Sequence, residues 1–332
     1  MAKESFLVIG AGAWGTALSI RLAKNGLEVS LTSRDKKNLS EIRKTKQNKK
    51  YLPGINIPES INIEDEILPR LANSSSVLLC VKSTGFKKIA ADLNNHMGPE
   101  QKLIWATKGL DPDTGETFSE TIKKEMPSLN KTAIISGPTF AEEVAKGKPT
   151  AITLASENIQ KLNALANTLS SPSFRVYTSN DIVGVQLGGA CKNIVAIAAG
   201  ASDALGLGAN ARTALITRGL EEMKSIGVSF GAKPETFFGL SGLGDLVLTS
   251  TDNQSRNRRL GLLIGSGLSL DESIEKLGTT PEGVHAVKAI YNKLALQEGL
   301  PITSAVYSIL FEGIPAESLV NKLMTRPIKE EL

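Results

Sequence analysis

The first half of the chain alternates short apolar runs with segments in which apolar residues recur every three or four positions. Short apolar or β-branched runs bounded by turn residues are typical of strands, and the longer spacing is typical of helices. We expect strands at residues 5–9, 28–32, 77–81, 103–106, 133–136, 151–154 and 174–177, and helices ending near 25 and spanning 86–97, 118–124, 140–146 and 159–170. Residues 44–50 are expected to form a solvated helix end and loop, and residues 53–58 an irregular excursion.

Beyond about residue 180 the strand pattern stops and helical spacing continues. The expected helices are 182–201, 212–227, 255–265, 270–277, 283–298 and 303–312. The sequence therefore predicts an α/β fold with an N-terminal Rossmann-type, doubly wound, mostly parallel sheet, followed by an all-helical C-terminal domain. We place the dinucleotide-binding domain at residues 1–180 and the helical substrate and catalytic domain at 181–332.

Composition narrows the function classes. The length of 332 residues is enough for two domains with their own cores, and 41% hydrophobic with 22% charged residues is typical of a soluble globular protein. A net charge of +4 is too weak a bias to indicate a nucleic-acid partner. Cys80 and Cys191 lie in apolar runs, and His96 and His285 lie far apart, so we expect neither a disulfide framework nor a metal site. We expect no signal peptide and no membrane span, and hence a cytoplasmic protein.

Gly10, Gly12 and Gly15 form a glycine-rich turn between the first expected strand and the first expected helix. In such a turn the first glycine permits the tight bend, the second lets the backbone approach a pyrophosphate, and the third allows close packing of helix on strand. The helix N-terminus adds amide donors and a positive dipole end. Because the required context of strand, turn and helix is present, the motif predicts dinucleotide binding.

The second expected strand ends at Thr32, and Thr32, Ser33 and Arg34 occupy the place where an NAD enzyme usually has a carboxylate for the ribose hydroxyls. A carboxylate would repel a 2′-phosphate, whereas a hydroxyl and a guanidinium can bind one. NADP(H) is therefore favoured, with NAD(H) possible. The alternative is that Arg34 is a surface residue near Lys36 and Lys37.

Two further strand ends carry polar residues where ligands of such sheets lie. Lys108 follows the fourth expected strand and could meet a phosphate or a carbonyl oxygen. Gly137 and Thr139 follow the fifth. Thr139 and Glu142 fit a capping box at the start of a helix. A capped helix end pointing into the crevice is also an anion site, so both interpretations stay open.

Residues 186–200 carry one charge, Lys192, among small and apolar side chains. Helical spacing puts Gly188 and Gly189 on its face, so the ammonium would sit over a shallow apolar shelf with room for a ligand. Burial lowers a lysine pKa, and such a lysine can pass a proton to or from a reacting oxygen. The alternative is a lysine that extends to water. Asp245, in a glycine-rich turn, could hold this lysine in place or could cap a helix.

Ser255, Arg256 and Asn257 begin a later expected helix. A hydroxyl, a guanidinium, an amide and a helix N-terminus together make a phosphate cradle. An ordinary capped basic turn, continued by Arg258 and Arg259, is the alternative.

Taken in order, these motifs closely resemble those of the prokaryotic-type NAD(P)-dependent glycerol-3-phosphate dehydrogenases. The motifs are the glycine turn at 10–15, Lys108, Gly-Pro-Thr at 137–139, Gly-Gly-Ala-Cys-Lys-Asn at 188–193, Gly-Leu-Gly-Asp at 242–245 and Ser-Arg-Asn at 255–257. The resemblance spans nearly the whole chain. It implies reversible reduction of dihydroxyacetone phosphate to sn-glycerol 3-phosphate, the backbone precursor of glycerophospholipids.

The resemblance also implies roles for individual residues. Lys192 would accept the proton in oxidation and donate it in reduction, with Lys108 and Asp245 as the other catalytic residues. The implied substrate contacts are Lys108, Gly137, Thr139, Lys192, Asp245, Ser255, Arg256 and Asn257. The implied cofactor contacts are Gly10, Gly12, Ala13, Trp14, Gly15, Arg34, Lys108, Ala141, Arg256, Thr280 and Glu282. Thr139 replaces the usual serine and keeps the hydroxyl, whereas the pair Thr280 and Pro281 replaces a commoner apolar pair, which weakens the case for Thr280.

Two other functions fit parts of the sequence. A β-hydroxyacid dehydrogenase of the same two-domain plan, acting on a carboxylate substrate, could use the same basic turn. A non-catalytic NADP(H)-binding sensor would keep the nucleotide fold but would not need Lys192, Asp245 and Lys108 together. The expected partners are a small phosphorylated triose and a second copy of the chain in a homodimer.

Overall fold

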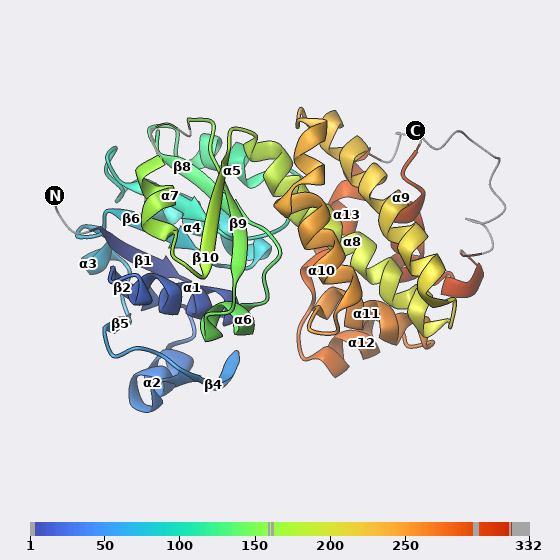
Figure 1. Cartoon of the computed structure of the whole chain (residues 1–332), viewed down its shortest axis with the longest axis horizontal. Helices are drawn as coiled ribbons and strands as arrows, with labels where there is room; N and C mark the ends of the chain where they lie inside the picture. The colour runs from blue at the N-terminus through green and yellow to red at the C-terminus, as the bar shows by residue number, and fades with distance from the viewer. Residues whose placement is uncertain (1–3, 159, 161–162, 295–298, 319, 321–332) are drawn as a thin grey trace.

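The protein has an α/β part and an all-helical part that lie side by side (Figure 1). The computed structural model describes residues 4–158, 160, 163–294, 299–318 and 320. Strands and helices alternate up to residue 179, and the described residues beyond it contain helices and helical turns without strands. The predicted fold class is therefore confirmed.

The main sheet has eight strands in the order β10-β9-β8-β7-β6-β1-β2-β5. The strands are β1 (Ser5–Ile9), β2 (Glu28–Thr32), β5 (Ile61–Glu64), β6 (Ser76–Leu79), β7 (Lys102–Trp105), β8 (Thr132–Ser136), β9 (Thr150–Ala155) and β10 (Phe174–Ser179). Only β8 and β9 pair antiparallel in this sheet. The order reverses between β1 and β6, and ligands of doubly wound sheets bind at such a reversal, beyond the carboxyl ends of the strands.

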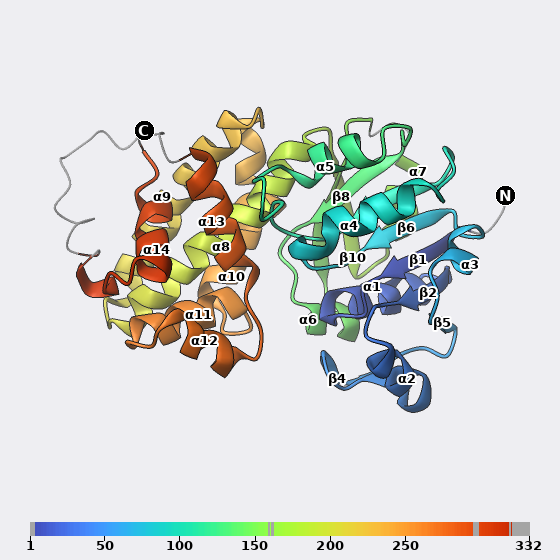
Figure 2. The ribbon, with the colours of Figure 1, turned by 180° about the vertical axis from the view of Figure 1, so that it is seen from behind.

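Helices cover both faces of the sheet, because successive residues of a buried strand point to opposite sides. Phe6 and Val8 of β1 pack on the side of α1 (Ala13–Lys24), whereas Leu7 and Ile9 pack on the side of α4 (Ser83–Asn94) and α5 (Phe118–Glu125). Figure 2 shows α4 and α5 in front of the sheet, and Figure 1 shows α1 there instead. The other helices of this half are α2 (Lys36–Thr45), α3 (Leu68–Leu71), α6 (Ala141–Lys146) and α7 (Asn163–Leu169).

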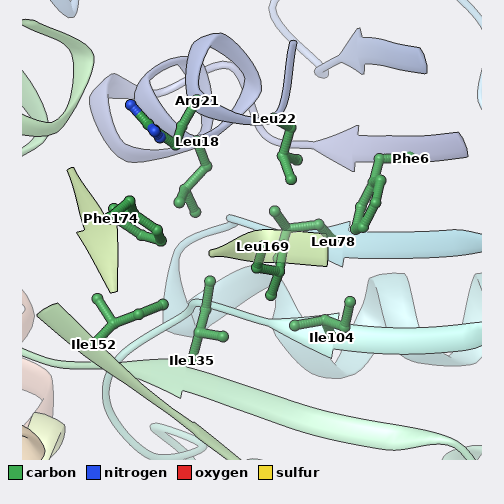
Figure 3. A pocket seen from close by; sticks show the side chains of 10 residues that line it. All are labelled: Phe6, Leu18, Arg21, Leu22, Leu78, Ile104, Ile135, Ile152, Leu169 and Phe174. Carbon is green, nitrogen blue, oxygen red and sulfur yellow. The ribbon is translucent and has the colours of Figure 1, made fainter. Parts of the chain in front are cut away.

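A cavity of about 10 Å³ lies between α1 and the sheet, lined by apolar side chains such as Leu18, Ile104 and Ile152 (Figure 3). Arg21 stands at its edge. The cavity is about the size of one water molecule. It is a packing gap in the core and not a ligand site.

The helical half is built around α8 (Ile182–Ala204), which is buried along most of its length. Around it lie α9 (Gly208–Ser229), α10 (Asp245–Thr251), α11 (Arg256–Gly265), α12 (Leu270–Leu277), α13 (Glu282–Leu294) and α14 (Pro301–Phe311). A β-carbon on Gly261 of α11 would lie 2.0 Å from the carbonyl oxygen of Ile197 on α8, so only glycine permits this close packing. By length and composition α8 could cross a membrane, but 89% of its most apolar window is buried, so the apolar sequence is explained by its place in the core.

The polar segment at residues 44–58 is more regular than predicted. Gln47–Asn48 and Leu52–Asn56 pair as the antiparallel strands β3 and β4, and β5 extends the main sheet beside β2. Leu52 and Ile55 of β4 are buried while the residues between them are exposed. The prediction was wrong because β3 and β4 are short and carry few apolar residues, so the sequence shows no clear alternation there.

Helix boundaries also differ from the prediction. The helix expected at 86–97 begins at Ser83, and the one expected at 212–227 begins at Gly208. The expected turn at 240–246 is helical: a π-helical turn, η3 (Leu240–Gly244), continues directly into α10, and a 3-10 turn, η2 (Pro234–Phe238), precedes it. Parts of the helices expected at 159–170 and 283–298 lie outside the described residues.

Candidate active site

Residues just beyond the carboxyl ends of β6, β7 and β8 contact the helical half, and we call this boundary between the two halves the crevice. The hydrogen bonds that cross it include Lys108 to Asp245, Ser83 to Glu282, and Lys82 to Thr279. The topology of the sheet thus brings residues that are far apart in sequence to one edge.

The glycine turn at residues 10–15 has the geometry that a dinucleotide needs. Gly10 has a φ of +121°, and a β-carbon there would lie 2.4 Å from the Cys80 carbonyl oxygen. A β-carbon on Gly15 would lie 1.9 Å from the Gly10 carbonyl oxygen. A β-carbon on Gly12, by contrast, would meet nothing within 4 Å, which leaves this side of the turn open to a ligand.

The start of α1 is likewise ready for an anion. Gly12 is its N-cap, so no side chain caps the first amides, and the first turn carries no acidic residue. The buried indole Nε1 of Trp14 has no hydrogen-bond partner among the described residues. An uncapped helix start beside an unpaired buried donor fits a bound pyrophosphate and its neighbouring polar groups.

Arg34 is exposed and lies over the first turn of α4, since a β-carbon on Gly85 would be 3.9 Å from its guanidinium nitrogen. The next residue, Asp35, is a carboxylate, but it accepts from the Asn38 amide at the start of α2 and pairs with Lys50 at 2.7 Å. The hydrogen bond from Lys50 lowers the pKa of Asp35. Asp35 is thus occupied by its own helix, and Arg34 is the group at this position that is available to a ligand.

Lys192 and Lys108 share the carboxylate of Asp245. Lys192 Nζ lies 2.6 Å from Asp245 Oδ1 and 2.6 Å from Thr249 Oγ1, and Lys108 Nζ lies 2.5 Å from Asp245 Oδ2. The side chains of Lys192 and Asp245 are 8% and 1% exposed, so the alternative of a lysine extending to water is wrong. Of the two roles considered for Asp245, the lysine contact is the one that forms: it begins α10 without serving as its N-cap.

Burial lowers the pKa of Lys192 to about 7. The nearby Asp245 charge opposes this shift, and the second ammonium of Lys108 adds to it. Desolvation wins because an ammonium loses most of its hydration inside the protein. An amine with a pKa close to neutrality can both accept and donate a proton under physiological conditions.

The glycines before Lys192 do not form an open shelf, which corrects the prediction. A β-carbon on Gly188 would lie 2.4 Å from the Ser241 carbonyl oxygen of η3, and one on Gly189 would lie 2.9 Å from Ser136 Oγ. Both positions are filled by protein. Gly188 instead lets α8 approach η3, the turn just before Asp245, and Gly189 lets α8 approach Ser136 of β8.

Gly137 and Thr139 border the lysine cluster, but the predicted capping box does not form. The Gly137 carbonyl accepts from Lys108 Nζ at 3.2 Å, and the Thr139 hydroxyl donates to the same carbonyl at 3.2 Å. The helix α6 begins one residue later than a box from Thr139 to Glu142 requires, with Phe140 as N-cap and no side-chain cap. Ala141 is its first residue.

The Ser255 to Asn257 turn is partly committed to holding the fold. The Ser255 hydroxyl caps α11 by accepting from the Arg258 amide at 3.2 Å. Asn257 accepts from the Gly283 amide at 2.9 Å and donates to Asn193 Oδ1 at 2.8 Å. Arg256 is exposed. Both interpretations of this turn therefore have support, because Ser255 caps the helix while Arg256 is available to an anion.

The remaining predicted cofactor contacts lie at the start of α13. Glu282 reaches across the crevice to Ser83, and its Oε2 lies 3.7 Å from where a β-carbon on Gly109 would be. Thr280 is half-buried in the segment before this helix.

The sequence reasoning missed four polar residues of the crevice: Ser83, Ser136, Asn193 and Thr249. The Ser136 hydroxyl is buried without a hydrogen-bond partner among the described residues, beside Lys108 and Gly189. Thr249 follows Asp245 by one helical turn, so the helical spacing would have indicated it had the segment been recognised as a helix.

A Rossmann-type sheet, together with a crevice that holds a buried lysine paired to a carboxylate, defines the class of nucleotide-dependent dehydrogenases. Residues 5–162 match the sequence model of the NAD-dependent glycerol-3-phosphate dehydrogenase N-terminus, and residues 181–321 match that of its C-terminus. The chain belongs to the NAD-dependent glycerol-3-phosphate dehydrogenase family.

Individual relatives agree with this assignment. The chain is 43% identical to a glycerol-3-phosphate dehydrogenase [NAD(P)+] of Pasteurella multocida over 100% of this chain and 99% of the relative. It is 44% identical to one of Shigella boydii over 99% of this chain and 98% of the relative. The crystal structure of glycerol-3-phosphate dehydrogenase from Coxiella burnetii superposes with a TM-score of 0.93 at 39% identity, covering 98% of this chain and 99% of that one.

Proposed function

We propose that the protein transfers hydride reversibly between NAD(P)H and dihydroxyacetone phosphate to give sn-glycerol 3-phosphate. Relatives that match over the full chain carry this enzyme name. The observation that carries the proposal is the buried Lys192, which pairs with Asp245 at the crevice between the two halves. A non-catalytic nucleotide sensor would have no use for this buried pair.

The residues of the glycine turn would hold the pyrophosphate of the cofactor, since Gly12 is open and the start of α1 is uncapped. When bound, the nicotinamide supplies or accepts the hydride. Lys192 donates a proton to the ketone oxygen in reduction and takes it back from the hydroxyl in oxidation. Asp245 and Thr249 fix its amine, and the second ammonium, on Lys108, stabilises negative charge that develops on the substrate oxygen.

The substrate phosphate would bind at the start of α11, where Arg256 is exposed and the helix N-terminus offers amides. We assign Gly137, Thr139, Ser255 and Asn257 to the substrate side. A fixed phosphate orients the carbonyl carbon toward the cofactor. We assign Ala13, Trp14, Ala141, Arg256, Thr280 and Glu282 to the cofactor side.

We propose NADP(H) as the preferred cofactor, with NAD(H) also accepted. The support is that Arg34 is exposed at the end of β2, while the neighbouring carboxylate of Asp35 is neutralised by Lys50. A guanidinium attracts a 2′-phosphate. The product would serve glycerophospholipid synthesis, and we place the enzyme in the cytoplasm.

We further propose a homodimer. Phe238 of η2, Leu243 of η3 and Val247 of α10 are 60%, 37% and 43% exposed. Leu243 and Val247 are one turn apart, so they share a face. A second copy would bury this apolar face, and light scattering would then show a monomer for Leu243→Glu where the wild type is a dimer.

One assay separates the candidate functions. NADPH and dihydroxyacetone phosphate are mixed with the enzyme, and the loss of reduced-nicotinamide absorbance is followed. Turnover supports the proposal. Turnover only with a 2-keto acid would instead favour a β-hydroxyacid dehydrogenase, and cofactor binding without any turnover would favour a sensor.

A further inference from the structure

The helical half sends a carboxylate across the crevice to the nucleotide half. Glu282 Oε2 accepts from the Ser83 hydroxyl at 2.5 Å, and Glu282 Oε1 lies 3.4 Å from the Ser83 amide nitrogen. Ser83 is 2% exposed, and it begins α4 after a short turn that follows β6. The contact therefore lies beside the reversal point of the sheet.

The Glu282 carboxylate supplies a hydrogen-bond acceptor at the start of α4, where no side chain of α4 caps the helix. The N-cap of α4 is Lys82, whose side chain makes no capping hydrogen bond, although the helix is 12 residues long. Free amides and the positive end of the helix dipole favour an anion at this point. Glu282 thus acts as a helix cap donated by the other domain.

The other side of Glu282 is tied to the catalytic helix. The amide of Gly283 donates to Asn257 Oδ1, and Asn257 in turn donates to Asn193, the residue after Lys192. A β-carbon on Gly283 would lie 2.6 Å from Asn257 Oδ1, so a glycine is required here. A continuous series of hydrogen bonds therefore runs from α4 through α13 and α11 to α8.

We propose that Ser83 is a positioning residue for cofactor binding, which holds the Glu282 carboxylate at the crevice before the cofactor arrives. The inference rests on the proposed function, in which Glu282 contacts the cofactor. A carboxylate accepts about four hydrogen bonds, so the bond from Ser83 leaves acceptor positions for ligand hydroxyls. A side chain that is already fixed loses less conformational freedom on binding.

The first test is Ser83→Ala, which removes the hydroxyl and adds no bulk. The dissociation constant of NADPH, measured by calorimetry without substrate, should rise about tenfold because a hydrogen bond to a charged group is lost. The KM for NADPH should rise in parallel, while kcat at saturating NADPH stays within about twofold. An unchanged or lower dissociation constant would overturn the proposal.

A double-mutant cycle shows whether Ser83 acts through Glu282. Adding Ser83→Ala to Glu282→Ala should weaken NADPH binding by less than about twofold beyond Glu282→Ala alone. Losses that simply multiply would mean that Ser83 acts independently, which contradicts the proposal.

Ser269→Ala is the matched control. Its hydroxyl, like that of Ser83, donates to a glutamate at the start of a helix, but this glutamate, Glu272, belongs to the same helix, α12. The control should lower thermal stability without changing NADPH affinity. An equal loss of NADPH affinity in the control would show a general effect of losing a hydroxyl at a helix start and would contradict the proposal.

The binding measurement also separates this proposal from the assigned reaction. If the wild type binds NADPH but does not reduce dihydroxyacetone phosphate, the proposed function fails, while the dissociation constants of the variants still decide the role of Ser83.

Discussion

The glycine turn of the nucleotide half and the lysine cluster of the crevice are built in different ways. The turn works through three glycines that lie within six consecutive residues, 10–15. The cluster works through charges that come from distant parts of the chain: Lys108 and Asp245 are 137 residues apart, and Lys192 and Asp245 are 53 apart. The glycine turn is formed by neighbouring residues, whereas the lysine cluster forms only after the two halves have folded and docked.

This difference has a physical consequence. In the turn, each glycine is required for a different steric reason. A substitution at one glycine should therefore change the stability of the fold, and a substitution at another should change ligand binding. In the cluster, two ammonium groups depend on one carboxylate, so any single change alters the charge balance of all three groups. Mutations should therefore give separable effects in the turn and coupled effects in the cluster.

The largest effect should come from Lys192→Ala. Loss of the proton donor should lower kcat by about 10²-fold to 10⁴-fold, while the dissociation constant of NADPH stays near the wild-type value. Stopped-flow turnover and calorimetry measure the two quantities. Comparable turnover in the variant would remove Lys192 from the chemistry.

Two glycine variants should separate the structural role of Gly10 from the ligand-binding role of Gly12. Gly10→Ala places a β-carbon 2.4 Å from the Cys80 carbonyl at a φ of +121°, so it should lower the free energy of unfolding by at least ~1–3 kcal/mol. Gly12→Ala meets no protein atom within 4 Å and should change that free energy by less than ~0.5 kcal/mol.

NADPH affinity completes this comparison. Gly12→Ala should weaken it at least tenfold (~1.4 kcal/mol), because the added methyl group would occupy space needed by the pyrophosphate. Denaturant unfolding and calorimetry report the two quantities. Wild-type affinity in Gly12→Ala would show that the cofactor does not approach this side of the turn.

Arg34→Asp should have a smaller effect, on cofactor choice alone. Replacing the guanidinium with a carboxylate should lower the ratio of kcat/KM for NADPH to that for NADH by about tenfold or more, through repulsion of the 2′-phosphate. Lys37→Asp is a matched control for charge on the same surface. A ratio that does not change with Arg34→Asp would assign 2′-phosphate recognition elsewhere.

The sequence was sufficient for the fold class, and it also indicated Lys108, Asp245 and Glu282, which the structure places at the contact between the two halves. The glycine turn and the strand ends could be recognised because their chemistry is contained in short segments. The contacts between segments could not: spacing left the role of Asp245 open, and it gave no indication that Ser241 and Ser136 fill the space beside Gly188 and Gly189.

The errors have the same origin. Thr139 and Glu142 have the spacing of a capping box. The Thr139 hydroxyl instead donates to the Gly137 carbonyl, so it does not cap α6. Ser83 was missed because its partner, Glu282, lies 199 residues further along the chain.

The pH dependence of kcat/KM tests most directly the claim that Lys192 exchanges the proton. Burial sets the pKa of Lys192 at about 7, so reduction, which needs the ammonium, should be flat below that pH and fall above it, while oxidation should rise through the same range. Asp245→Asn should move both midpoints to lower pH, because the Asp245 charge raises the pKa of Lys192. Midpoints near the pKa of 10.5 of a free lysine, or midpoints that Asp245→Asn leaves in place, would contradict the account.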